Sequence, residues 1–374
     1  MGTWLTNARY FHGEHNLLTD LSMQRHLGGL SGTYTSGSLL FMPALVCLLL
    51  SFAGCSKPPT RAQVFPIVEN WNCGRLAIDD SLNVWLADCN VSNSVRVFSN
   101  KLKWSTVSLP KTTGMKAAAA RHNIIYYVGD VDIPGGWESL IVKIAGRSIS
   151  RSWYFKKQAS FVGLAVDRKG NIWLADSNGK IAKISAGVRL KVIPIPGATP
   201  NDITIGTDDQ PWFTASGAAE IGSITRKGRV LSYKLPRADS DPEGLTVGPD
   251  EAIWFSERTA HKIGRLSRSG KITEFSLPDD HAALSIASGS DKNLWFTEPD
   301  ENLIGCITMS GRITEYRNPG ISGFLTGIVA DKNGSLWIIA QSGNTIWGLE
   351  RPTRDELIKI EPDFAHTQSC PSSL

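Results

Sequence analysis

The 374-residue sequence has few of the features that mark nucleic-acid-binding, nucleotide-binding or zinc proteins. Its formal net charge of +4 is spread thinly, and the densest basic cluster is the short segment 226–229. Basic patches interleaved with aromatic side chains are missing along the chain, so nucleic acid is not an expected partner. No glycine-rich phosphate loop joins a strand to a helix pattern, and no closely spaced cysteine and histidine set suggests zinc. The sequence therefore points away from these three classes.

A hydrophobic run long enough to span a membrane is also missing. The longest apolar segment, residues 39–53, has fifteen residues interrupted by Pro43, whereas a membrane helix needs about 20. Its length instead suits the apolar core of a secretory signal. An uncleaved anchor or a misread upstream frame is the alternative. With either a signal or an anchor, we expect the rest of the chain outside the cytoplasm, in the periplasm or at the cell surface.

Small residues end this segment directly before a cysteine. Phe52, Ala53, Gly54 and Cys55 resemble a bacterial lipobox, in which the cysteine is acylated and becomes the new N-terminus, although phenylalanine replaces the usual leucine. We therefore expect a lipid anchor on Cys55 and contact with a membrane through it. The segment before the apolar run is long for a signal, so the natural start is expected at Met23.

Short strand patterns repeat through residues 76–350 with a period of about 40 residues, which indicates a β-propeller. Each unit has an apolar run, a turn, an aromatic strand, a polar loop and two further strands with alternating polarity. Four such strands cannot bury their own faces, and closure into a ring solves this problem. The aromatic residue that opens the second strand recurs seven times, which predicts seven blades and a core role for it: Trp85, Tyr127, Trp173, Trp212, Trp254, Trp295 and Trp337.

These signals divide the chain into four parts. We expect an N-terminal extension and lipoprotein-type signal over 1–55, a linker over 56–70, one all-β seven-bladed propeller of four-stranded antiparallel blades over 71–362, and a tail over 363–374. Ring closure can bring Cys73 near Cys370, a bond that an oxidising compartment permits. Four unpaired thiols, with Cys89 and Cys306, are the alternative, because connectivity cannot be read from sequence.

The repeated segments resemble the blade consensus of the virginiamycin B lyase (streptogramin lyase) family, most clearly in the fourth to sixth blades. In the sixth blade these segments are residues 294–298, 302–308 and 311–316. The resemblance implies a seven-bladed propeller. It also implies an enzyme that opens a cyclic depsipeptide antibiotic by elimination, with a histidine base and a magnesium ion held by two glutamates.

The positions that this resemblance assigns to catalysis carry other residues. Leu284 and Thr326 stand where the family keeps histidines at the start of the sixth and seventh blades. Phe324 stands at the seventh-blade acid, and Gln341 lies near the second one. We therefore expect no streptogramin lyase activity. His281, three residues from Leu284, is a weak catalytic candidate.

The fifth blade keeps a similar frame with acidic residues. Glu243 takes the histidine's place after Asp241, and Glu257 follows the second strand. Both loops emerge on one face, so the three carboxylates can converge on calcium or magnesium. Alternatively they are structural, since acids end the second strand in five blades. His261, which opens a third strand, is a second weak catalytic candidate.

Three functions remain open. The leading one is an exported, monomeric, non-catalytic propeller that binds a small molecule or a protein on its upper, loop-rich face. The second is a metal-assisted carbon–oxygen lyase or hydrolase acting on a cyclic ester, which a histidine within hydrogen-bond reach of an acidic pair would favour. The third is an architectural module in an envelope complex.

Overall fold

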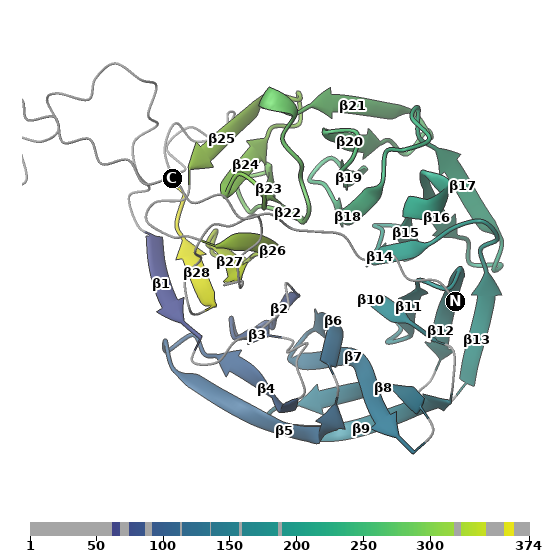
Figure 1. Ribbon diagram of the computed structural model, residues 1–374, viewed down its shortest axis with the longest axis vertical. Helices are drawn as coiled ribbons and strands as arrows, with labels where there is room; N and C mark the ends of the chain where they lie inside the picture. Colours follow the sequence, from purple (N-terminus) through teal and green to yellow (C-terminus); the bar gives the residue numbers. More distant parts are fainter. Residues whose placement is uncertain are drawn as a thin grey trace, which may run out of the picture. The chain divides into compact units, whose positions relative to one another are not determined.

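A computed structural model describes residues 62–67, 75–86, 92–112, 114–134, 136–156, 159–185, 189–317, 323–341 and 355–362. In this part of the chain, seven four-stranded antiparallel sheets form a ring (Figure 1). The predicted all-β, seven-bladed propeller is therefore confirmed. The expected signal, Cys55, the expected Cys73–Cys370 pair and the tail over 363–374 lie outside the described residues.

The first three blades follow the chain in order. Blade 1 consists of β2 (Leu76–Ile78), β3 (Val84–Leu86), β4 (Ser92–Phe98) and β5 (Trp104–Thr112). Blade 2 consists of β6 (Gly114–Arg121), β7 (Ile124–Ile133), β8 (Gly136–Ala145) and β9 (Ser148–Lys156). Blade 3 consists of β10 (Phe161–Val166), β11 (Ile172–Asp176), β12 (Lys180–Ser185) and β13 (Arg189–Pro194).

Blades 4 to 6 are the most regular. Blade 4 consists of β14 (Pro200–Ile205), β15 (Pro211–Ala215), β16 (Glu220–Ile224) and β17 (Val230–Lys234). Blade 5 consists of β18 (Pro242–Val247), β19 (Ile253–Glu257), β20 (Lys262–Leu266) and β21 (Ile272–Ser276). Blade 6 consists of β22 (Ile286–Ser288), β23 (Leu294–Glu298), β24 (Leu303–Ile307) and β25 (Ile313–Arg317).

Blade 7 combines both ends of the propeller. Its inner strands are β26 (Phe324–Ala330), β27 (Leu336–Gln341) and β28 (Glu356–Ile360), and its outermost strand is β1 (Ala62–Pro66). β1 pairs antiparallel with β28, with Val64 opposite Ile358. The segment 56–70, expected to be a linker, thus contains the strand that closes the ring. Closure satisfies the edge of β28, which would otherwise offer unpaired backbone groups.

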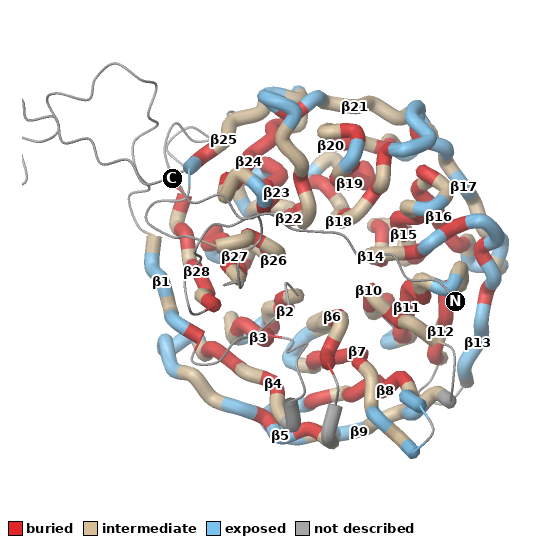
Figure 2. Tube along the Cα trace, viewed as in Figure 1, coloured by how far each residue is buried: buried red, intermediate tan, exposed pale blue. Residues whose placement is uncertain are grey.

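The recurrent aromatic lies on the second strand of every blade, as predicted. Six of the seven are buried, and Trp212 is half-buried and stacks on Tyr233. In five blades the indole N–H donates to an aspartate of the preceding turn, for example from Trp254 to Asp250 over 2.9 Å and from Trp337 to Asp331 over 3.0 Å. Figure 2 shows the buried positions gathered on the inner strands and the exposed ones on the outermost strands and loops. These aromatics are therefore core residues.

Helix is confined, in the described residues, to the short 3₁₀ turns η1 (Ser216–Ala218) and η2 (Pro278–Asp280). Neither is long or apolar enough to span a membrane. Cys306, buried on β24, is disulfide-bonded, and its partner lies outside the described residues, as every other cysteine does.

Candidate functional site

The first strands of the blades surround the centre of the ring (Figure 1). A small pocket lies among them. Its volume is about 170 Å³. It is lined by residues at or near the start of the first strands of blades 1, 5, 6 and 7: Arg75, Glu243, Gly244, Leu284, Ser285 and Thr326. Equivalent positions of three consecutive blades therefore converge on one pocket.

Local backbone geometry brings Glu243 to this pocket. Asp241 adopts a left-handed conformation with φ of 49°, and the pairing of β18 with β19 shifts register between Pro242 and Leu245. Such a bulge re-aims a side chain. A Cβ on Gly244 would lie 2.8 Å from the carbonyl oxygen of Leu284, so only glycine fits where β18 approaches blade 6.

The pocket is polar and carries both signs of charge. Burial, followed by the charge of Asp241, raises the pKa of Glu243, although the Asn201 side-chain amide donates to its carboxylate. Arg75 forms an ion pair with Asp202 at 3.4 Å, which joins blades 1 and 4. The buried hydroxyl of Thr326 has no hydrogen-bond partner. The pocket therefore offers a guanidinium, a carboxyl that takes up a proton readily and an unused hydroxyl.

The structure also places the positions identified by resemblance. Leu284 and Thr326 line the pocket beside Glu243, and Phe324 lies opposite Gln341 across β26 and β27. The residues within each of these two groups therefore lie close together in the structure. It stays a prediction that these positions correspond to the catalytic histidines and acids of a lyase.

The three carboxylates expected to bind calcium or magnesium are not gathered into one set. Among the described residues, Asp241, Glu243 and Glu257 do not form a group whose ligand atoms all lie within 4.8 Å of one another. The charge of Asp241 acts on the pKa of Glu243, whereas Glu274 and Lys262 act on the pKa of the fully buried Glu257. Burial raises the pKa of Glu257 to about 7, and neither of its oxygens accepts a hydrogen bond of ordinary geometry. Sequence spacing predicts that the two loops share a face, but it does not fix how far apart their carboxylates lie.

A different cluster forms in blade 6. Nδ1 of His281 lies 3.0 Å from Glu298 Oε2 and 3.3 Å from Glu315 Oε2. Among the described residues, only these three offer potential metal-ligand atoms all within 4.8 Å of one another. Burial, with added repulsion from Glu315 and Glu301, raises the pKa of Glu298 to about 9. Burial also raises the pKa of Glu315, against the opposing effect of His281.

Both weak catalytic candidates belong to this region. Nδ1 of His261 lies 3.2 Å from the carbonyl oxygen of His281, which can only accept, so His261 donates. Neither histidine lines the central pocket. Sequence analysis singled out His281 but not Glu315, although the repeated segments 270–275 and 311–316 place Glu274 and Glu315 at equivalent positions.

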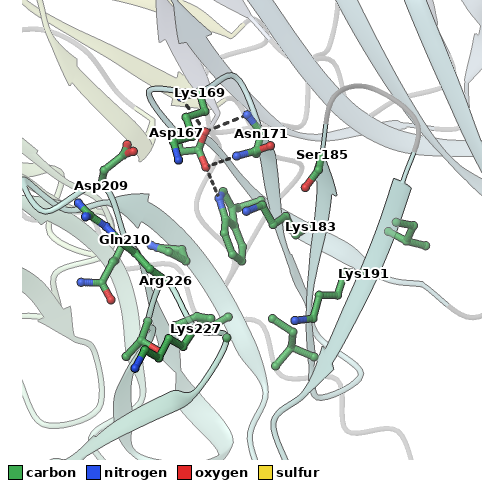
Figure 3. Close-up of a pocket in the computed structure, with 17 residues that line it drawn as sticks. Asp167, Lys169, Asn171, Lys183, Ser185, Lys191, Asp209, Gln210, Arg226 and Lys227 are labelled. Carbon is green, nitrogen blue, oxygen red and sulfur yellow. Dashed lines mark hydrogen bonds between the residues drawn. The ribbon is translucent and has the colours of Figure 1, made fainter.

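A larger groove of about 850 Å³ lies between blades 3 and 4, at the turns that follow their first and third strands (Figure 3). Five cationic side chains line it, namely Lys169, Lys183, Lys191, Arg226 and Lys227. The Nζ of Lys183 lies 4.6 Å above the ring of Trp173, whose N–H donates to Asp167. Two acids, Asp167 and Asp209, also line the groove. Although the sequence has no basic run, the fold gathers these cations where an anionic group can bind.

Comparisons with known proteins identify the family of the chain. The model of the virginiamycin B lyase family matches residues 148–356. The chain belongs to this family. The match runs from the outermost strand of blade 2 to blade 7 and so includes Glu243, Leu284 and Thr326 of the central pocket.

Solved structures of virginiamycin B lyase resemble most of the chain. A catalytically inactive histidine-to-alanine variant of virginiamycin B lyase from Staphylococcus aureus, with quinupristin, is 25% identical with a TM-score of 0.69, covering 80% of this chain and 99% of that chain. The selenomethionine-substituted enzyme from Staphylococcus aureus is 25% identical with a TM-score of 0.70, at the same coverage. The WD40 propeller domain of Doa1, at 10% identity and a TM-score of 0.60, covers 80% of this chain and 97% of that chain and shares the fold alone. No curated protein matches the chain.

Proposed function

We propose that this member of the virginiamycin B lyase family binds a small polar ligand in the central pocket and does not linearise streptogramin B antibiotics. One observation carries the proposal. Glu243, Leu284 and Thr326 occupy equivalent positions at the pocket, and none has an imidazole that could accept a proton at neutral pH. Fold and family membership alone do not establish activity, which depends on the residues of the site.

The chemistry of the pocket indicates the class of ligand. Arg75 supplies donors, Thr326 has an unused hydroxyl, and the raised pKa of Glu243 favours a protonated carboxyl that can donate as well. Such a set suits a ligand with carbonyl, ester or carboxylate oxygens. The small volume suits a compact ligand or one group of a larger ligand or protein partner.

Antibiotic turnover tests the missing activity. The purified protein is incubated with quinupristin and magnesium, and chromatography follows the linear product. We expect a rate lower than that of an authentic lyase by at least about 10²-fold, because loss of a general base typically has that effect. Turnover close to that of the authentic enzyme would refute this part of the proposal.

Thermal melts test ligand binding. A panel of small carboxylates and cyclic esters is added to the wild type, and at least one is expected to raise the melting temperature by binding only the folded state. Arg75→Ala should remove the shift, whereas Lys183→Ala, in the groove between blades 3 and 4, should keep it. A shift that survives Arg75→Ala would place the ligand elsewhere.

We also propose that the mature chain is exported, begins at Cys55 and carries lipid. The apolar segment 39–53 and the small residues before Cys55 support this, as does the disulfide bond of Cys306, which suits an oxidising compartment. Mass spectrometry of the membrane fraction should detect an acylated N-terminal cysteine. A soluble product that retains Met1 would contradict it.

A second candidate function is a metal-assisted carbon–oxygen lyase or hydrolase acting on a cyclic ester. The contact of His281 with Glu298 and Glu315 favours it, since a histidine oriented by acids is a common general base. Lactone opening by the wild type that is lost in His281→Gln would support this candidate. Equal rates in the two proteins would exclude it.

A further inference from the structure

We propose that His281, Glu298 and Glu315 form a binding site for a divalent transition metal, with zinc as the representative ion, on blade 6. This site is distinct from the central pocket and independent of the proposed ligand. It joins three separate segments: the connection after η2, the end of β23 and the middle of β25. A bound ion would therefore fasten the connection between blades 5 and 6 to the outer part of blade 6.

The distances from His281 to the two glutamates fit a shared ion. Nδ1 of His281 lies 3.0 Å and 3.3 Å from the two glutamate oxygens. Ligands at about 2.0 Å from a tetrahedral zinc ion are separated by about 3.3 Å, so an ion can replace the hydrogen bonds with small movements. A set of one imidazole and two carboxylates suits zinc better than calcium or magnesium, which prefer oxygen ligands throughout.

Unused oxygens provide an independent indication of a ligand. Glu298 is fully buried, and its Oε1 accepts no hydrogen bond. Oε1 of Glu315 and Oε2 of the neighbouring Glu301 are also buried without partners. Buried carboxylate oxygens are normally paired or bound to metal. Glu298 already contacts His281 through its other oxygen, so its free oxygen lies at the same cluster.

Blade 5 places an ammonium beside the equivalent pair of acids. Glu257 and Glu274 occupy the positions of Glu298 and Glu315, and the Lys262 ammonium donates to Glu274. Lys262 pairs in register with Glu257, and the matching residue opposite Glu298 is Leu303. Blade 6 thus replaces a fixed ammonium with an apolar residue and adds a histidine, which is a metal ligand.

Metal analysis and calorimetry of the full chain test the site. The protein is treated with chelator, dialysed and titrated with zinc chloride. We expect one equivalent to bind and to raise the melting temperature. His281→Gln and Glu298→Gln should weaken binding by at least about tenfold, because even residues that only support metal ligands commonly contribute that much. The matched control is Glu257→Gln, which changes the equivalent acid of blade 5 and should leave zinc binding unchanged.

A spectroscopic measurement distinguishes loss of metal binding from unfolding of the variants. Cobalt added to the chelator-treated wild type should give the visible absorption of tetrahedral coordination, and Glu315→Gln, if folded by circular dichroism, should lose it. Failure of the wild type to bind zinc would mean that an ordinary ion pair holds His281, and would overturn the proposal. Binding that persists unchanged in His281→Gln, or binding of calcium in preference to zinc, would overturn it as well. None of these outcomes depends on the central pocket.

Discussion

At the scale of single residues, small side chains in blades 4 to 6 make room for large ones. A Cβ on Gly222, Gly264 or Gly305 would lie 2.0–2.1 Å from the phenyl ring on the adjacent strand. In blade 5 the same glycine also accommodates Glu257, whose Oε1 would lie 2.8 Å from that Cβ. The tryptophan core could be predicted from its repetition. The burial of Glu257 could not, because it depends on a missing side chain one strand away.

Replacing Glu257 with glutamine is expected to stabilise the protein at high pH. Its pKa rises from 4.5 to about 7 on folding, so the folded state favours the protonated form. The resulting stability is complete below about pH 4.5 and is lost as pH rises through 7. At pH 8, Glu257→Gln should therefore raise the free energy of unfolding by about 1–3 kcal/mol, and at pH 5 by much less.

Urea denaturation at both pH values measures this effect. Glu251→Gln serves as the control, because Glu251 is half-exposed and pairs with the exposed Arg268, and its effect should stay within about 0.5 kcal/mol. An equal effect of Glu257→Gln at pH 5 and pH 8 would show that the carboxyl is not held protonated.

At the scale of strands, the sequence repeat predicts the strands that recur in every blade but does not predict β1, which has no counterpart in the repeat. Six blades take all four strands from one continuous stretch of chain, and the repeated segments of these blades predict the number of blades. β1 stands alone before the first blade, without the tryptophan or turn residues of a repeat, so its sequence predicts a linker rather than a strand. Its sequence alternates weakly, with Phe65 half-buried and Val64 40% exposed. Only the unsatisfied edge of blade 7 explains why it becomes a strand.

The docking of β1 can be tested by changing one face of it. The ring of Phe65 lies 4.4 Å from that of Phe98 in blade 1 and 6.2 Å from that of Trp337 in blade 7. Phe65→Ala should lower the free energy of unfolding by about 2–4 kcal/mol, less than for a fully buried phenylalanine. Val64→Ala, on the adjacent exposed position, should change it by less than about 1 kcal/mol. Thermal melts that rank the two variants in the opposite order would show that β1 does not close the ring.

At the scale of the whole molecule, ring closure decides which residues meet. The spacing from the recurrent aromatic assigned Leu284, Thr326 and Glu243 to equivalent positions, and in the ring all three line one pocket. The sequence repeat did not predict that Arg75, which comes from blade 1, lines the same pocket. It also could not foresee the cationic groove, whose side chains are dispersed over Lys169 to Lys227. Local periodicity specifies strands, whereas sites between blades depend on the closed ring.

The buried acids of the ring predict an uncommon pH dependence of stability. Folding raises the pKa of five glutamates, each mainly through burial, namely Glu243, Glu257, Glu298, Glu315 and Glu356. Between about pH 4.5 and 9 the folded chain therefore binds more protons than the unfolded chain, so the free energy of unfolding falls as pH rises. The lowered pKa values of Asp167, Asp239 and Asp250 act in the opposite sense, but only below about pH 4. Urea denaturation with chelator present, to keep metal from Glu298 and Glu315, should give a higher stability at pH 5.5 than at pH 9. A stability that rises over this range would mean that the glutamates ionise without cost in the folded ring.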